Sequence, residues 1–209
     1  MRNKFTKYFV MLVAIAISIQ LQAQTQSPKK ALSFNGSTQY VSGTGISTSL
    51  TAFTIEAWVY HNTLPDLPPG VVQRYVTINP EVAVLRYDGS GSGGTNELHF
   101  YIKNASGAIV SLRVNNVLST TWMHIAGTYD GTTMKLYLNG KLLKSGAAVG
   151  LTAPSGSFSI GATNGSSEAF DGAMDEVSVW NYARTMADIR ELVSTLLVPI
   201  KPLANLLKT

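Results

Sequence analysis

The sequence lacks cysteine entirely and contains few charged residues. None of its 209 residues is a cysteine, which excludes disulfide bonds, zinc sites with thiolate ligands and thiol nucleophiles. Charged residues make up 13% of the chain and form no basic stripe, so we expect no nucleic-acid partner. Without disulfides, the fold must be stabilised by a hydrophobic core, helped by a metal ion if one binds.

One long hydrophobic run is present, at the N-terminus. The segment "MRNKFTKY" carries three bases and no acid, and "FVMLVAIAISI" after it is too short to span a bilayer as a stable helix. "QLQA" follows, with Ala23 at the expected cleavage site. This layout is typical of a secretory signal peptide and predicts a secreted, periplasmic or cell-surface protein with no stable membrane span after cleavage. Without residues 1–23 the net charge falls from +4 to +1.

The rest of the chain has no strong helical period before residue 185. Instead, short runs such as "FTIEAWVY", "ELHFYIK" and "MKLYLN" alternate apolar and polar residues, and 18 glycines supply turns between them. The clearest example is residues 123–143, where Asp130-Gly131 and Asn139-Gly140 predict two tight hairpin turns in a three-strand meander. These features predict a single all-β domain made of two stacked antiparallel sheets.

A short helix is expected only near the C-terminus. In "TMADIREL", Thr185 and Asp188 have the spacing of a capping box, and Met186 and Ile189 begin an apolar stripe. Beyond it, "LLVPIKPLANLLKT" contains two prolines that forbid a continuous helix, so we interpret residues 195–209 as an irregular tail.

Four segments carry a family resemblance over residues 31–194: "ALSFNGSTQYV", "FTIEAWV", "TTWMHIAGTYDGTTMKLYLNGKLL" and "FDGAMDEVSVWNYARTMADI". Their order and spacing resemble the LamG-like, concanavalin A-like lectin/glucanase domains. The resemblance implies a two-sheet antiparallel jelly-roll sandwich in which the first and last strands pair in one sheet. We therefore expect a signal peptide (1–23), a short linker (24–30), a jelly-roll domain (31–194) and the tail (195–209).

Enzyme activity is not expected. The glucanases of this family carry catalytic acids as E-x-D-x-E or E-x-D-x-x-E, and the nearest segment here, "MDEVSVW", has the wrong spacing and lacks the third acid. Glu56 and Glu176 are the acids within strong strand patterns, and a glycosidase would need such a pair about 5–9 Å apart. The alternative, which we favour, is that each has a structural partner, for instance Arg184 for Glu176.

His124 and the three tryptophans also have structural interpretations. A catalytic histidine needs a nucleophile and an orienting acid, and no such set is evident around His124. We expect it to hydrogen-bond backbone or hydroxyl groups such as that of Thr128. Trp58, Trp122 and Trp180 are interpreted as packing residues.

The resemblance also implies a metal site. Relatives bind calcium near the meeting point of the first and last strands, and the matching positions are Asn35 and Asp175, with Asp171 as a weaker candidate. Their oxygen atoms suit one structural Ca²⁺, and a micromolar site in millimolar calcium would add about 4 kcal/mol of stability. The alternative is that Asp175 hydrogen-bonds backbone turns without a metal.

A ligand surface is the last candidate. Alternation places His99 and Tyr101 on one face of a strand, and polar positions such as Tyr75 and Arg113 on neighbouring strands can extend that face. Aligned, they would form an aromatic, hydrogen-bonding surface suited to sugar rings. The alternative is an ordinary solvated sheet face.

The function expected from this resemblance is a secreted, non-catalytic binding module for carbohydrate or a cell-surface glycan. The alternative is an adhesion module that binds a surface protein, and a glycoside hydrolase is the third possibility. Because one fold hosts many functions, these expectations rest on the family and not on the fold alone.

Overall fold

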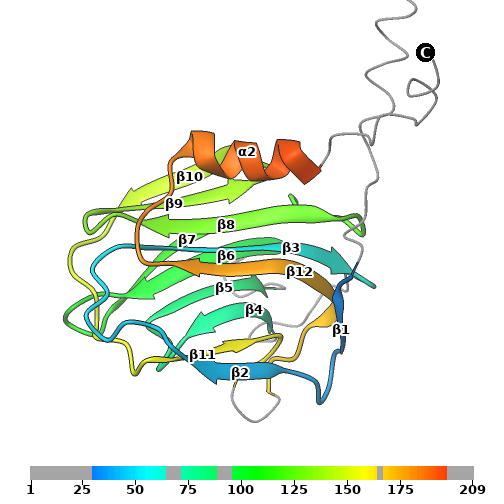
Figure 1. Cartoon of the computed structure of the whole chain (residues 1–209), viewed down its shortest axis with the longest axis horizontal. Helices are drawn as coiled ribbons and strands as arrows, with labels where there is room; N and C mark the ends of the chain where they lie inside the picture. Colours follow the sequence, from blue (N-terminus) through cyan, green and yellow to red (C-terminus); the bar gives the residue numbers. More distant parts are fainter. Residues whose placement is uncertain (1–29, 65–71, 89–95, 164–166, 197–209) are drawn as a thin grey trace, which may run out of the picture.

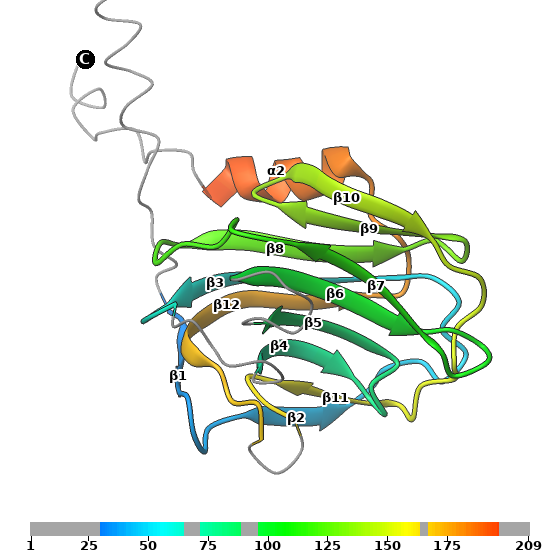
Figure 2. The same ribbon diagram turned by 180° about the vertical axis from the view of Figure 1, so that it is seen from behind.

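Two six-stranded antiparallel sheets pack face to face in the computed structural model, which describes residues 30–64, 72–88, 96–163 and 167–196 (Figure 1). The first sheet has the order β1 (Leu32–Asn35), β12 (Asp171–Trp180), β3 (Phe53–His61), β8 (Met123–Tyr129), β9 (Thr133–Leu138) and β10 (Lys141–Ala147). The second sheet, in front in Figure 2, has the order β2 (Val41–Thr44), β11 (Ser157–Ile160), β4 (Val72–Ile78), β5 (Ala83–Asp88), β6 (Glu97–Lys103) and β7 (Ile109–Val114). The predicted all-β jelly-roll sandwich is confirmed, including the pairing of the first and last strands, β1 with β12.

The core lies between the sheets and follows the predicted alternation. In β3, Phe53, Ile55 and Ala57 are fully buried and face the second sheet, whose Phe100 meets the Phe53 ring edge-on at 6.2 Å between centroids. Gly127 on β8 lies against the Phe100 ring, and a Cβ atom there would come within 2.7 Å of that ring. The glycine is therefore needed because the two sheets approach each other closely at this point.

The predicted meander is confirmed as β8, β9 and β10, which are neighbours in the first sheet. Its two turns differ. Asn139 and Gly140 both have positive φ angles, as the tightest hairpin turn requires. In the first turn only Gly131 does, and the Asp130 carboxylate instead accepts hydrogen bonds from the backbone N–H groups of Thr132 and Thr133, at 3.0 and 2.8 Å.

The predicted helix is present as α2 (Met186–Leu196), which ends two residues beyond the expected domain boundary. Both halves of its capping box form: the Thr185 N–H donates to the Asp188 carboxylate at 2.8 Å, and the Asp188 N–H donates to the Thr185 hydroxyl at 3.2 Å. Ile189 packs with Ala126 and Tyr137, so the helix covers part of the outer face of the first sheet (Figure 1).

No helix among the described residues is long and apolar enough to cross a membrane. The predicted signal peptide, residues 24–29 of the linker and the tail from residue 197 lie outside the described residues, so these predictions stay open.

Candidate ligand-binding surfaces

The outer face of the second sheet carries a layer of polar side chains. Strand register places Arg86 opposite His99 and His99 opposite Arg113, while Tyr101 lies opposite Ser111. Three of the four predicted ligand-binding residues therefore share this face. We call the following set the polar layer: Arg86, Asp88, Glu97, His99, Tyr101, Ser111 and Arg113.

Two buried carboxylates hold the arginines of the polar layer in place. One guanidinium nitrogen of Arg113, Nη1, donates to Asp88 Oδ2 and to Glu97 Oε2, each at 2.8 Å. Arg86 donates to the same Asp88 oxygen at 2.9 Å. Burial alone would raise the pKa of Asp88, but the guanidinium charges of Arg86 and Arg113 outweigh it and hold that pKa well below its usual range.

His99 is neutral within this network. Burial lowers its pKa to about 4, so the imidazole is uncharged at pH 7. Arg86 Nε donates to its Nδ1 at 3.0 Å, which places the single imidazole proton on Nε2, 3.2 Å from the Ser111 hydroxyl. His99 therefore orients its neighbours and is not placed to act as a base.

The accessible part of the polar layer differs from the prediction. Tyr101 is only 3% exposed, and its ring lies 5.3 Å from the His99 ring and 5.3 Å from the Arg86 guanidinium. It therefore supports the layer from within. Solvent reaches Ser111 and the side chain of Arg113, which is 25% exposed.

Tyr75 does not belong to this surface, so that part of the prediction is wrong. A bulge between Arg74 and Val76 inserts one extra residue in β4 and turns Tyr75 into the core, where it is fully buried. Its hydroxyl is 2.8 Å from Nε2 of His61, whose pKa burial lowers to about 4.

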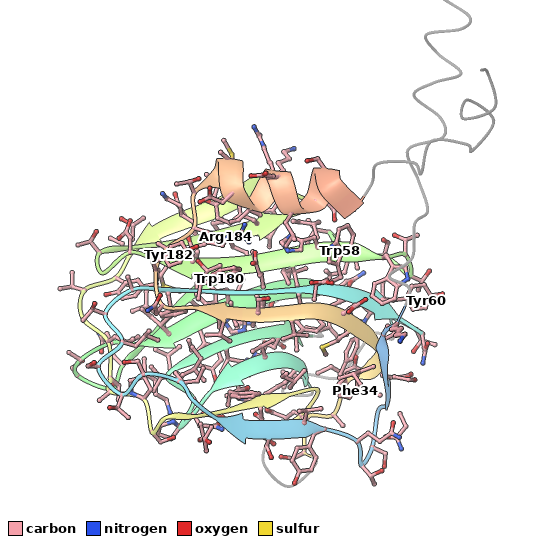
Figure 3. All side chains as sticks on the ribbon, viewed as in Figure 1. Phe34, Trp58, Tyr60, Trp180, Tyr182 and Arg184 are labelled. Atoms are coloured by element: carbon pink, nitrogen blue, oxygen red, sulfur yellow. The ribbon has the colours of Figure 1, made fainter. Side chains whose placement is uncertain are left out.

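The outer face of the first sheet carries a second set of polar and aromatic residues (Figure 3). Glu56 is fully buried there, and its Oε1 accepts hydrogen bonds from Arg184 Nη1 at 2.5 Å and from Trp180 Nε1 at 2.6 Å. The expected pair of Arg184 with Glu176 is therefore wrong. A bulge between Asp175 and Ser178, with Glu176 at a φ of 50°, leaves Glu176 exposed while Arg184 reaches Glu56 instead.

His124 has a structural environment, although not the expected one. Its ring meets Trp58 edge-on at 5.6 Å between centroids, and its Nε2 lies 3.6 Å from Glu56 Oε2. Neither ring nitrogen has a hydrogen-bond partner among the described residues, so the expected bond to Thr128 is absent. Burial lowers its pKa to about 4. Trp58 is buried as expected, whereas Trp180 is 36% exposed.

The proposed calcium ligands do not come together as one set. Asp171 is the residue of β12 that pairs with Asn35. Asp175 lies four residues further along β12, and four residues of a strand span about 13 Å. Two ligands of one Ca²⁺ must lie within about 5 Å of each other. Moreover, Asn35 Oδ1 already accepts three backbone N–H groups in the turn after β1, and no group of three His, Cys, Asp or Glu among the described residues could hold a metal.

We therefore expect Asn35 to stabilise its turn without a metal. Asn35→Ala should lower the free energy of unfolding by about 1 kcal/mol, because three backbone donors lose their acceptor at an exposed site. The loss, measured by urea unfolding, should be equal in EDTA and at about 2 mM Ca²⁺. A loss seen only with calcium present would re-establish the metal site.

Sequence reasoning missed the acidic half of the polar layer. Asp88 and Glu97 face each other across β5 and β6. They lie at the two ends of the glycine-rich segment "GSGSGGTN". If that segment is taken as the turn of a hairpin, Asp88 and Glu97 are predicted to lie opposite each other.

The stacked antiparallel sheets and the closing helix define a lectin-type jelly roll. A family model described as the concanavalin A-like lectin/glucanases superfamily matches residues 35–190. The chain belongs to that superfamily. No curated protein sequence matches it.

Three similar solved structures are described as binding proteins or binding domains. A protein from Bacteroides ovatus ATCC 8483 described as carbohydrate-binding is 25% identical, with a TM-score of 0.59 over 79% of this chain and 48% of its own. The Ruminococcus gnavus IT-sialidase CBM40, bound to α2,3 sialyllactose, is 12% identical, with a TM-score of 0.58 over 79% of this chain and 97% of its own. The binding domain of botulinum neurotoxin serotype D is 12% identical, with a TM-score of 0.63 over 82% of this chain and 44% of its own. The chain thus spans about half the length of the first and third proteins, and the two at 12% identity support the fold alone.

Proposed function

We propose that the chain is an exported, non-catalytic module that binds carbohydrate through the exposed edge of the polar layer. Membership of the lectin/glucanase superfamily and the likeness to the Bacteroides ovatus protein support the ligand class. The N-terminal segment "MRNKFTKYFVMLVAIAISIQLQA" supports export.

The observation that carries the proposal is the fixed orientation of two guanidinium groups. Bonds among the described residues use two of the five N–H donors in each of Arg86 and Arg113. Because buried Asp88 and Glu97 hold these side chains, a ligand hydroxyl or carboxylate that binds the other donors need not bear the cost of ordering them. Exposed Ser111 adds a hydroxyl at the same edge.

The surroundings of Glu56 support a non-catalytic role. A glycosidase needs a carboxylic acid that donates a proton to the glycosidic oxygen. Glu56 is fully buried, and its Oε1 already accepts hydrogen bonds from Arg184 and Trp180.

The test is a glycan array probed with the protein and with Arg113→Lys. Lysine keeps a positive charge between Asp88 and Glu97 but has only a point charge in place of the planar fork. We expect about tenfold weaker retention on the glycans that the wild type binds, with an unchanged melting temperature. Lys141→Ala, an exposed basic residue of β10, is the control.

Three results would contradict the proposal. Equal retention of Arg113→Lys and wild type would remove the polar layer as the site. Binding to surface proteins but to no glycan would favour the adhesion alternative, and release of reducing sugar would favour a hydrolase.

A further inference from the structure

Two exposed aromatic rings lie on the outer face of the first sheet, on the opposite side of the sandwich from the polar layer. Trp180 ends β12 and is 36% exposed, and Tyr182, two residues on, is 48% exposed. Their ring centroids are 5.7 Å apart and their planes are inclined at 64°, so each ring presents its own face, and Figure 3 shows both at the end of β12, beside Arg184. Asn181 between them is also exposed. We call Trp180, Asn181 and Tyr182 the aromatic shelf.

Buried partners hold the aromatic shelf rigid. The indole N–H of Trp180 donates to fully buried Glu56, and the Arg184 guanidinium lies 4.9 Å from the Trp180 ring centroid. The backbone beside Tyr182 is fixed by Thr54, whose hydroxyl donates to the Tyr182 carbonyl at 2.9 Å and accepts from the Arg184 N–H at 2.8 Å. A ligand that stacks on these rings would therefore meet a surface that is already ordered.

The hydrogen bonds that hold Trp180 and Tyr182 in place involve only part of each residue. The bond to Glu56 uses only the Nε1 edge of Trp180, and the bonds to Thr54 use only backbone atoms at Tyr182. Tyr182 as a whole residue is 48% exposed, and the exposed part of its ring gains no free energy from burial. Exposed aromatic surface that is held rigid is a feature of binding sites.

The charges around the aromatic shelf select the class of ligand. Arg184 is the nearby cation, and it is paired with Glu56, while its Nη2 donates to the Asp188 carbonyl at 2.8 Å. The surface therefore offers apolar ring faces, a side-chain amide and a phenol hydroxyl, and the cation beside Trp180 is already paired. A neutral pyranose fits this chemistry, because it has an apolar C–H face and a rim of hydroxyl groups.

We infer that the aromatic shelf is a second carbohydrate-binding surface, which binds neutral sugar residues by stacking. The inference extends the proposed function, since it assumes the same class of ligand at a separate place. Because the polar layer and the aromatic shelf lie on opposite outer faces, one molecule can hold two glycan chains at once.

The test is native affinity electrophoresis in gels that contain β-glucan, xylan or galactomannan, all neutral or nearly neutral polymers. Tyr182→Ala removes the most exposed ring and leaves the backbone bonds to Thr54 in place. We expect it to bind the retarding polymer about threefold to tenfold more weakly, with an unchanged melting temperature. Tyr40→Ala, which removes a 41% exposed tyrosine just before β2, should migrate as the wild type does.

Cross-linking gives a second measurement. The wild type should raise the turbidity of a solution of the polymer that it binds, whereas Tyr182→Ala and Arg113→Lys should each bind without raising it.

If Tyr182→Ala is retarded in the gel as the wild type is while Arg113→Lys is not, the shelf inference is overturned and the proposed function stands. If only Tyr182→Ala loses retardation, the shelf is supported and the polar layer is not. If no polymer retards the wild type, the shelf inference is overturned, and the glycan array decides the proposed function separately.

Discussion

Replacing Arg184 with methionine is expected to lower the free energy of unfolding by about 3–5 kcal/mol. The substitution leaves Glu56 fully buried, without the guanidinium that neutralises it. Methionine keeps much of the volume of the arginine stem. The loss of stability is therefore caused more by the unpaired Glu56 charge than by a cavity. Urea unfolding followed by tryptophan fluorescence at pH 7 measures it.

Two further variants show whether the Glu56–Arg184 pair is the cause. Glu176→Gln removes an exposed acid from the same region and should change the stability by less than about 0.5 kcal/mol. Adding Glu56→Gln to Arg184→Met should recover part of the loss, because the buried charge itself is then gone. A loss below about 1 kcal/mol for Arg184→Met alone would mean that solvent already screens the pair.

The architecture could be predicted because its determinants are local. Alternation in Met123, Ile125 and Tyr129 placed these side chains in the core, and the Asn139-Gly140 turn set the register of β9 with β10. The capping box of Thr185 and Asp188 marked the start of α2 within one residue. Each of these signals acts within a few residues of the chain, where the sequence can be interpreted directly.

The errors occur where a bulge reverses the alternation. Side chains in a strand alternate with a period of two, so one inserted residue exchanges the faces of everything beyond it. The bulge at Arg74–Val76 sends Tyr75 into the core, and the bulge at Asp175–Ser178 exposes Glu176. Neither bulge is marked by a glycine at the inserted position, so the sequence contains no local sign of it.

The polar layer was predicted only in part, for a different reason. His99, Tyr101 and Arg113 were found because they alternate within their own strands. The two carboxylates that orient the arginines lie on β5 and β6, and only the pairing register of these strands brings them together. Similarly, Glu56 and Arg184 are 128 positions apart in the sequence. Contacts of this range depend on how whole strands are arranged, which alternation does not determine.

Acidification is expected to destabilise the protein between pH 6.5 and 4, which is a higher pH range than that in which most native carboxylates are protonated. The chain has three histidines, and all three are buried: His61, His99 and His124. Burial lowers the pKa of each to about 4, whereas in the unfolded chain each titrates near 6.5. Below pH 6.5 the unfolded chain therefore binds protons that the folded chain does not, and stability falls until the folded histidines also titrate near pH 4.

The expected loss is about 1–2 kcal/mol per histidine at pH 5, measured as the free energy of urea unfolding at pH 7.5, 6 and 5. Asp88 does not oppose this change, because its lowered pKa makes a contribution that is lost only at still lower pH. His124→Phe provides the sharpest control. It removes a ring that makes no hydrogen bond among the described residues, so the stability at pH 7.5 should change little while about a third of the pH dependence disappears. If the wild type is equally stable at pH 7.5 and pH 5, the histidines are protonated in the native state, and a buried, uncharged His124 between Trp58 and Glu56 cannot be correct.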